Sequence, residues 1–233
     1  MNTVAYFDKA QSFLDAQLRD DPQAVVRPET SLRAITISRQ AGCGAAIVAE
    51  RLAQLLKARD KATSAPWTVF DRNLIEQVLK EHDLPVRFAK YLPEDRVSEI
   101  QDAMHALFGV HPSAWTVVEH TAETILRLAQ LGNVILIGRG ANRITAALPG
   151  VFHVRLVSPL EQRIEHAHKF YNLSLPEARE FVAREDGGRA RYFKKYFAAE
   201  VDDPLHYHLV INTGLVSFEK AADLIFSAAT VPK

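Results

Sequence analysis

Apolar residues along the chain form short continuous runs, separated by longer segments in which they recur at helical spacing. The runs are typical of buried strands and stand at 34–38, 67–70, 133–137, 151–157 and 207–211. The helical spacing predicts amphipathic helices over 45–58, at 74–79, up to residue 131 and after Pro159. Strands that alternate with helices predict βαβ units, and therefore an α/β fold whose largely parallel sheet has helices on both faces.

Further signals mark helix ends in the second half of the chain. Gly132 stops the helical pattern that precedes the third run. The stretch from Ser174 to Glu177 has the spacing of a capping box and predicts one helix, and we expect a separate charged helix over 181–199. Ser217 is the expected N-cap of the last helix.

The first 30 residues differ in pattern from the rest. Their apolar residues, Phe13 among them, lie near one side of a predicted helix over 1–19, and a linker rich in Asp, Pro and Arg follows. We therefore predict an N-terminal helical extension and linker over 1–30 and one main domain over 31–233. The extension is a candidate contact for a partner or for a second copy in a homodimer.

Composition narrows the class of protein. The 233 residues include 28 basic and 28 acidic side chains, and this balance argues against a broad surface for nucleic acid or anionic membrane. A chain of this length buries a large core without a disulfide, and its single cysteine fits a reducing compartment. Asp8 and Lys9 interrupt the apolar stretch of a signal peptide, and no apolar run is long enough for a bilayer. We expect a soluble, cytoplasmic protein with no nucleic-acid or membrane partner.

A glycine-containing turn joins the first run to the first helix. Glycines let backbone N–H groups point toward one place, and the helix N-terminus adds partial positive charge there. This predicts an anion site formed by Gly42, Cys43, Gly44, Ala45 and Ala46. A tight turn without a ligand is the alternative. The phosphate-loop pattern G-x-x-x-x-G-K-[ST] is not matched, because Ala45 stands at the lysine position, and Arg39 is the candidate replacement for the missing charge.

Several side chains near the strand ends have two interpretations. Cys43 is either a nucleophile or, as we favour, a small residue in a turn. Ser38 bonds either an acceptor phosphate or the turn backbone. Asp71 either holds a metal through water, or bonds a nucleotide sugar, or caps the next helix. The two histidine pairs at 166/168 and 206/208 lack a third ligand at convincing spacing, which favours structural roles over a metal site.

Several stretches, in this order, resemble the cytidylate kinase-like family of P-loop nucleotide kinases. They are I-T-I-S-R-Q-A-G-C-G at 35–44, F-D-R-N-L-I at 70–75, V-I-L-I-G-R-G-A at 134–141, P-L-E-Q-R-I at 159–164, R-E-D-G-G-R-A-R-Y-F-K-K-Y-F at 184–197 and D-P-L-H-Y-H-L-V-I-N-T at 203–213. The resemblance implies a three-layer P-loop kinase fold with a five-stranded parallel sheet. It also implies a helical insert that binds a nucleoside monophosphate over 72–132, and a helical lid over 171–205.

The resemblance also implies a reaction and the residues that carry it. The family's true cytidylate kinases move a phosphoryl group from ATP to CMP or dCMP with Mg²⁺. By position, the turn at 42–46 would form the phosphate loop, and Arg72 and Arg139 would hold the acceptor. Arg189, beside Asp186 in the lid motif, would neutralise charge on the transferring phosphoryl group. This chain departs from those enzymes at Gly140, where they carry an aspartate that helps read cytosine.

Arginines are numerous after the third run, and their planar fork can bond two phosphate oxygens at once. They are Arg139, Arg143, Arg155, Arg163, Arg184, Arg189 and Arg191. The candidate catalytic residues are Arg139, Asp186 and Arg189. The candidate substrate-binding residues are Asp71, Arg72, Arg139, Gly140 and Arg163. The alternative for Asp186 and Arg189, three apart on a helix, is an exposed ion pair that contributes little.

Two functions fit this pattern. The first is an ATP-dependent phosphotransferase that acts on a nucleoside monophosphate or a similar small acceptor. The second is a nucleotide-binding regulatory or scaffold protein that senses its ligand without turning it over, because the phosphate-loop lysine is absent. In both, the expected partner is a nucleotide or a small phosphorylated ligand.

Overall fold

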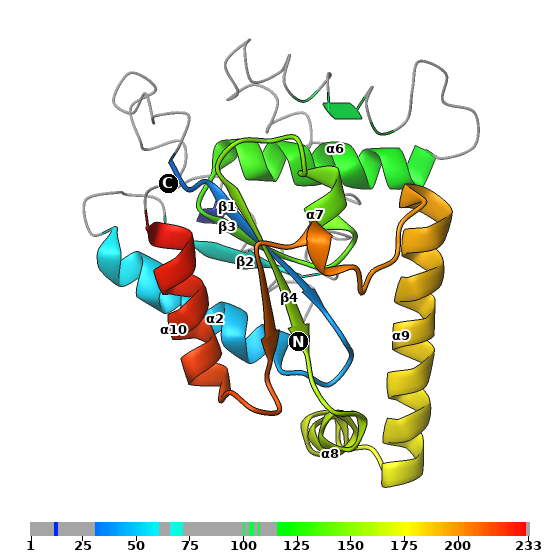
Figure 1. The fold of residues 1–233 in the computed structure, drawn as a ribbon. Helices are drawn as coiled ribbons and strands as arrows, with labels where there is room; N and C mark the ends of the chain where they lie inside the picture. The colour runs from blue at the N-terminus through cyan, green and yellow to red at the C-terminus, as the bar shows by residue number, and fades with distance from the viewer. Residues whose placement is uncertain are drawn as a thin grey trace.

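The computed structural model describes residues 12–13, 31–60, 66–71, 100, 103–104, 107 and 116–231. At its centre lies a five-stranded parallel sheet with the strand order β2-β3-β1-β4-β5. The strands are β1 (Ala34–Arg39), β2 (Thr68–Phe70), β3 (Val134–Ile137), β4 (Val151–Val157) and β5 (Leu209–Asn212). The predicted α/β fold with a five-stranded parallel sheet is confirmed (Figure 1).

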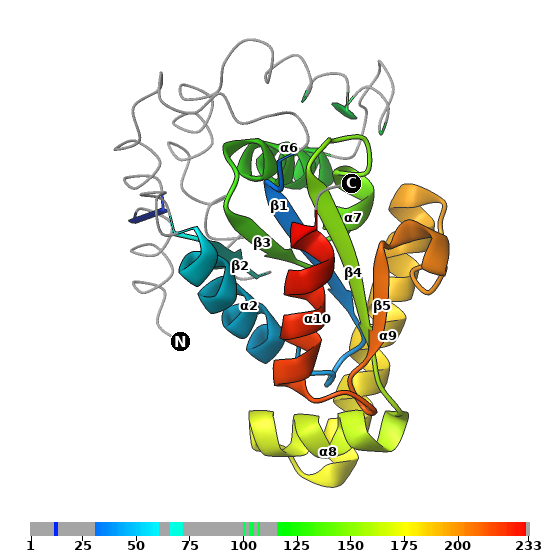
Figure 2. The ribbon, with the colours of Figure 1, turned by 60° about the vertical axis from the view of Figure 1, so that its left-hand side comes forward.

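Helices form a layer on each face of the sheet. One face is covered by α2 (Ala45–Arg59) and α10 (Phe218–Thr230), and the other by α6 (Thr116–Leu131) and α7 (Ala141–Ile144) (Figure 2). Two further helices, α8 (Leu160–Tyr171) and α9 (Leu175–Phe197), pack on each other. Figure 1 shows α8 beyond the carboxyl end of β4 and α9 on the side of the sheet away from α2.

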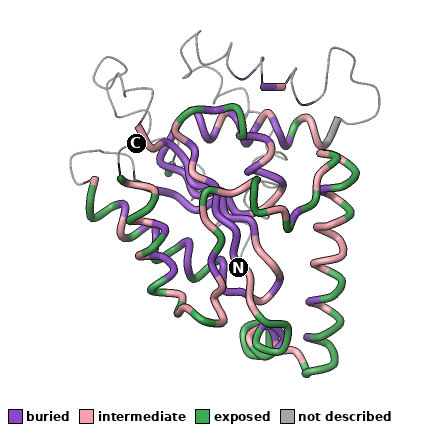
Figure 3. The backbone as a smooth tube through the Cα atoms, viewed as in Figure 1, coloured by how far each residue is buried: buried purple, intermediate pink, exposed green. Residues whose placement is uncertain are grey.

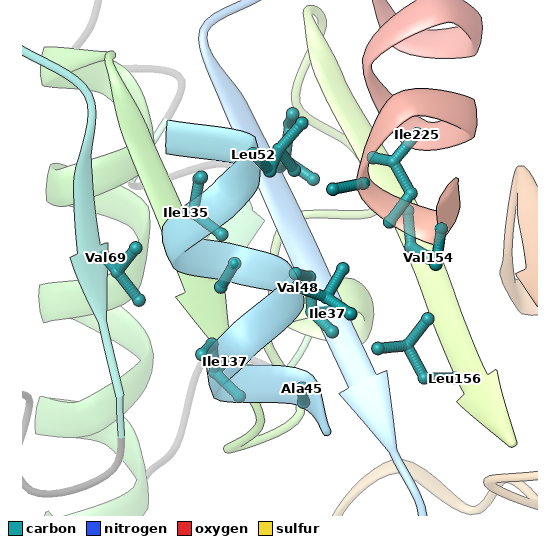
Figure 4. Close-up of a cluster of buried hydrophobic side chains, with 14 of the residues drawn as sticks. Ile37, Ala45, Val48, Leu52, Val69, Ile135, Ile137, Val154, Leu156 and Ile225 are labelled. Carbon is teal, nitrogen blue, oxygen red and sulfur yellow. The ribbon is translucent and has the colours of Figure 1, made fainter. Parts of the chain in front are cut away.

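Alternation along β1 decides which layer each side chain joins. Ile35 and Ile37 are fully buried against α2 and α10, in a cluster that includes Leu52 (Figure 4). Burial of each such side chain stabilises the fold by about 1.5–3 kcal/mol. The opposite face of β1 presents Thr36 and Ser38, which are also buried. Polar groups therefore stand on the inner surface of the sheet where α7 and α9 approach it.

Burial is concentrated in the sheet and in the inner sides of the helices that cover it, as Figure 3 shows. Most residues of α9 are exposed or half-buried, and those fully buried are Ala178, Val182 and Phe193. The polar sides of α9 are therefore available to line a site. Among the described helices, none combines the length and the apolar character that crossing a membrane requires.

The structure corrects three details of the predicted elements. The helices predicted from Ser174 and over 181–199 are one helix, α9, which continues through Gly187 and Gly188. The capping box at Ser174 is confirmed. The last strand begins at Leu209 rather than at 207, because η1 (Pro204–His206), a single 3-10 turn, occupies the segment before it. The helix α7 was not predicted, since its four residues are too few for a periodic pattern.

The described part of the N-terminal extension is Ser12 and Phe13, which are helical. The Phe13 side chain is buried, and its ring meets Phe70 of β2 edge-on, with centroids 5.2 Å apart. The helix predicted at 74–79 lies outside the described residues. The same holds for the first part of the predicted insert over 72–132, from residue 72 to residue 115, apart from residues 100, 103, 104 and 107.

Candidate functional site

The turn between β1 and α2 needs glycine at two positions. Gly42 and Gly44 have φ angles of 81° and 74°, a left-handed backbone that glycine adopts without strain. Space is also limiting: a Cβ on Gly42 would collide with the carbonyl oxygen of Arg163, and one on Gly44 with the ring of Phe218. The turn therefore packs tightly against α8 and α10.

The N-terminus of α2 opens into a cavity. Gly44 is the N-cap and supplies no side-chain hydrogen bond to the first turn. Uncapped N–H groups at a helix N-terminus, together with the helix dipole, favour an anion. A cavity of about 230 Å³, here called the loop hollow, is lined by all residues from Arg39 to Ile47 and by Asp71. Of the predicted phosphate-binding residues, which are Ser38, Arg39 and the five from Gly42 to Ala46, all except Ser38 line it.

A second cavity, of about 240 Å³, lies beside the loop hollow and is here called the arginine hollow. Its lining includes Ser38, Arg139, Gly140, Arg184 and Arg189. The structure thus brings together five predicted site residues, which are Ser38 and Arg39 of β1, Arg139 and Gly140 of the turn after β3, and Arg189 of α9. The two cavities share three lining residues, which are Arg39, Glu185 and Arg189.

Arg39 stands at the junction of the two hollows. Its guanidinium lies against Gly138, where an added Cβ would displace Nη1. Burial, and then the charge of Arg189, lower the pKa of Arg39 to about 10, which leaves it cationic at neutral pH. Within the part of the chain that the structure describes, Arg39 forms no ion pair. Glu185 is the nearby carboxylate that raises the pKa of Arg39, but it makes no ion pair with it, and a cation beside a second cation favours an anionic ligand.

Asp186 fastens α9 to the loop. Its Oδ1 accepts a hydrogen bond from the backbone N–H of Ala41 at 2.7 Å and from Arg189 Nη1 at 2.9 Å, and its Oδ2 accepts from Arg163 Nη1 at 2.5 Å. Arg189 also donates to Glu185 at 3.3 Å. The pair of Asp186 and Arg189 is half-buried. Asp186 lines neither hollow, so its contacts favour a positioning role, and its predicted catalytic role stays a prediction.

Arg163 is buried and bound to the protein itself. Its Nε donates to the carbonyl of Ser158 at 2.9 Å, and its Nη1 donates to the carbonyl of Ala41 at 3.3 Å as well as to Asp186. The residue lines neither hollow. These contacts favour a structural role that holds the loop, in place of the substrate contact predicted for Arg163.

The turn after β3 has an unusual backbone. Gly138, Arg139 and Gly140 are all left-handed, with φ angles of 81°, 55° and 70°. Non-glycine residues rarely adopt this conformation, and residues with a strained backbone cluster at functional sites. A Cβ on Gly140 would collide with the ring of Phe197, so an aspartate there would have to displace that ring. The hydroxyl of Tyr192 donates to the carbonyl of Arg139 at 3.5 Å, which joins this turn to α9.

Ser38 and Cys43, each predicted with two interpretations, are buried. Ser38 Oγ accepts a hydrogen bond from Arg155 Nη1 at 2.8 Å while lining the arginine hollow. The thiol of Cys43 donates to the carbonyl of Gln40 at 2.9 Å, and burial raises its pKa to about 11. A protonated thiol is not a nucleophile, which favours the structural interpretation of Cys43.

The remaining predicted residues are Asp71 and Arg72. Asp71 lines the loop hollow, which places a carboxylate at the carboxyl edge of β2. Arg72 lies outside the described residues. The lining residues that sequence reasoning missed include Asn142 of α7 and Glu185, Tyr192 and Phe193 of α9. For α9 a signal existed: residues 185, 189 and 192 follow helical spacing and share one face.

The family model described as the cytidylate kinase-like family matches residues 34–215. The chain belongs to this family. The match contains every stretch on which the predicted resemblance rests, and that prediction is confirmed. The loop hollow is lined by the turn at 42–46, which the resemblance to this family identified as the phosphate loop.

A solved structure of a protein from Eubacterium ventriosum is similar to this member of the cytidylate kinase-like family. The TM-score is 0.57, the identity is 16%, and the match covers 85% of this chain and 98% of the other, which supports the fold alone. A structure from Thermus thermophilus, 17% identical over 86% of this chain and 100% of the other, has a TM-score of 0.40. A uronate isomerase from Corynebacterium glutamicum is 27% identical over 138 residues, 59% of this chain and 26% of that protein. Because the chain spans only that share of the isomerase, the isomerase activity is a property of that protein alone.

Proposed function

We propose that the protein transfers a phosphoryl group from ATP to a nucleoside monophosphate or a similar small phosphorylated acceptor. The observation that carries the proposal is that the loop hollow and the arginine hollow meet at the guanidinium groups of Arg39 and Arg189. A donor bound on the loop and an acceptor in the arginine hollow would bring their phosphates together at this junction.

The chemistry needs little covalent help from the protein. Phosphoryl transfer requires in-line positioning and positive charge on the oxygens of the moving group. Arg39 leaves the end of β1 just before the loop, where it can supply the charge that a phosphate-loop lysine would supply. Arg189 approaches the same place from α9, and its ion pairs with Glu185 and Asp186 orient its planar fork.

The arginine hollow offers two kinds of contact to an acceptor. Arg139 and Arg184 supply charge for a phosphate, while Tyr192 and Phe193 supply ring surface for a base. Gly140 supplies no carboxylate, and the ring of Phe197 fills the place where one would project. The aspartate that reads cytosine in true cytidylate kinases thus has no counterpart at this position, so the acceptor need not be CMP.

Magnesium fits the loop hollow as a companion of ATP. Among the described residues, no three or more His, Cys, Asp or Glu side chains gather to hold a metal by themselves. Mg²⁺ in kinases is bound through one or two carboxylates and the substrate phosphates, and Asp71 is the carboxylate that would contribute. Bound there, the ion would neutralise charge on the phosphates.

The test is a panel of nucleoside monophosphates with ATP and Mg²⁺, read as ADP production. We expect turnover with at least one acceptor, and Arg189→Ala and Arg39→Gln should each lower kcat by about 100-fold or more. The matched control is Arg179→Ala, which removes an exposed arginine of the same helix that pairs with Glu161. Equal losses in all three variants, or no ADP with any acceptor, would count against a kinase.

One contact favours the second function, a nucleotide sensor without turnover. The Asp186 carboxylate already occupies the Ala41 amide of the loop, as an internal anion would. A sensor would bind ATP and gain thermal stability without forming ADP. The same panel measured by thermal shift distinguishes the two: stabilisation with ADP production supports the kinase, and stabilisation alone supports the sensor.

A further inference from the structure

A third cavity lies on the face of the sheet that α7 covers, and neither function described above uses it. It measures about 460 Å³ and is here called the histidine hollow. Its lining includes Asn142 and Arg143 of α7, His153 of β4, and His206 and His208 from the segment that leads into β5. Figure 1 shows that segment passing beside α7, and Arg143 Nη1 contacts His206 Nδ1 at 3.4 Å.

Two nitrogen atoms in this lining are buried and unsatisfied. The side-chain Nδ2 of Asn142 and the Nε of Arg143 have no hydrogen-bond partner within the described residues. Asn142 is only 3% exposed. A buried N–H group without an acceptor costs about 1–3 kcal/mol, and more when it is charged, so a small side-chain rotation that brings either group to an acceptor on a ligand would recover that cost.

The charges in the lining favour an anion. Arg143 carries a full positive charge, and the contact that its Nη1 makes with His206 is to an imidazole rather than to a carboxylate. Asp203, whose Oδ2 lies 3.7 Å from His206 Nε2, is on the far side of that ring from Arg143. Asp202 is engaged elsewhere, by the guanidinium of Arg155 at 2.5 Å. A guanidinium whose neighbours are histidines and an amide matches an oxyanion.

The histidines add neutral polar contacts. The backbone N–H of His153 donates to His208 Nδ1 at 2.9 Å, so the ring proton of a neutral His208 is on Nε2. Burial, and then the neighbouring His208 and Arg143, lower the pKa of His153 to about 3. His153 therefore stays neutral and shares a hydrogen bond with Thr36 Oγ1 at 2.9 Å. The lining is polar on several sides, and its volume suits a small organic molecule.

We propose that the histidine hollow binds a small organic molecule through a carboxylate or phosphate group held by Arg143 and Asn142. This site adjoins the arginine hollow, with which it shares Asn142, and it does not depend on the proposed phosphoryl transfer.

The test uses the full chain and two probes, glycerol 3-phosphate and malonate, which distinguish a phosphate ligand from a carboxylate ligand. Histidine ring signals are followed by NMR at a fixed pH, and His206 and His208 are assigned from His206→Gln and His208→Gln. His166 lines the loop hollow and reports binding there. We expect at least one probe to shift the signals of His206 and His208 saturably.

Variants show whether those shifts come from the proposed site. Arg143→Gln should weaken the probe by about tenfold or more, since a hydrogen bond to a charged group contributes at least that much. The exposed Ala146 also lines the hollow, so Ala146→Glu should repel the probe while Ala146→Gln should not, without loss of a core contact. The proposal is overturned if neither probe moves His206 or His208, if only His166 moves, or if the shifts persist in Arg143→Gln and Ala146→Glu.

Discussion

Gly140 lines the arginine hollow in the turn after β3. Its left-handed backbone and the nearby ring of Phe197 both require glycine. We expect Gly140→Ala to destabilise the protein by about 1–3 kcal/mol, because the added Cβ meets strain and a clash together. Urea unfolding measures the loss, and a variant as stable as the wild type would contradict this account of the turn.

The burial of His153 predicts that the stability of the fold decreases as the pH is lowered. Its pKa in the folded protein is about 3, against 6.5 for the ordinary side chain, chiefly because it is buried. The unfolded chain takes up the proton first, so stability is present above pH 6.5 and is lost as the pH falls toward 3. The slope for one group is at most about 1.4 kcal/mol per pH unit.

The measurement is urea unfolding at pH 7, 6 and 5. His153→Gln carries no titrating group and should show a smaller fall in stability over this range than the wild type. His120→Gln, at an exposed position of α6, is the control and should follow the wild type. Identical slopes for all three chains would show that His153 does not contribute.

Cys43 should be chemically inert in the folded protein. Its pKa of about 11 and its hydrogen bond to Gln40 keep the thiol protonated and buried at pH 7.5. Because the thiolate is the reactive form, we expect iodoacetamide to label the folded chain about 100-fold more slowly than the urea-unfolded chain. The chain has one cysteine, so intact mass reports this site alone. Equal labelling rates would support a reactive loop thiol.

At this scale the sequence located the loop residues but not their contacts. The pattern of Gly42 and Gly44 was sufficient to predict an anion site, because glycine spacing acts locally. The bond from the Ala41 amide to Asp186 joins residues 145 positions apart, and no local pattern encodes it. For the same reason the sequence does not show that Arg163, one arginine among seven, bonds Asp186 and the carbonyl of Ala41.

At the scale of elements, α9 contributes several lining residues of the arginine hollow, and two glycines inside it lower its stability as a helix. The helix runs through Gly187 and Gly188, between Arg184 and Arg189. Glycine inside a helix is less favourable than alanine by about 0.5–1 kcal/mol. A Cβ on Gly188 would meet nothing within 4 Å. We expect Gly188→Ala to raise stability by about that amount in urea unfolding, and a lower stability would show that the glycine fits a bend.

The elements that the sequence predicted well are those with long or fully apolar patterns. The third and fourth runs match β3 and β4 within one residue, and α2 matches its predicted range within one residue. The glycine pair interrupts the pattern of α9 without ending the helix, which is why two helices were predicted there. Tyr207 and His208 continue an apolar alternation, which is why the last strand was predicted to begin at residue 207. In the structure the 3-10 turn η1 begins at Pro204, and β5 begins only at Leu209.

At the scale of the whole molecule, the arginine hollow and the histidine hollow share a wall. Asn142 lines both. Thr36 of the arginine hollow is hydrogen-bonded to His153 of the histidine hollow, and the Tyr207 hydroxyl lies 3.3 Å from Ser38 Oγ. Ligands on the two sides would therefore affect each other through side chains that touch both.

We expect the two ligands to weaken each other's binding, because both are anionic and Asn142 lines both hollows. A coupling free energy of about 1 kcal/mol, roughly fivefold in affinity, is typical of linked sites. The measurement is the Kd of the nucleotide that the kinase panel identifies as acceptor. It is determined with and without a saturating concentration of the probe that binds the histidine hollow, in the wild type and in Thr36→Val. Equal Kd values with and without the probe would mean that the sites are independent.

The contact between Phe13 and Phe70 bears on how the protein should be produced. A truncation that begins at the family boundary, residue 34, would delete Phe13, and with it a ring that is 1% exposed and covers the outermost strand. Loss of that cover amounts to about 1.5–3 kcal/mol of buried aromatic surface. Truncated versions should have a lower melting temperature and should aggregate through the exposed β2. The first thirty residues should therefore be kept when the protein is produced for crystallography or enzymology.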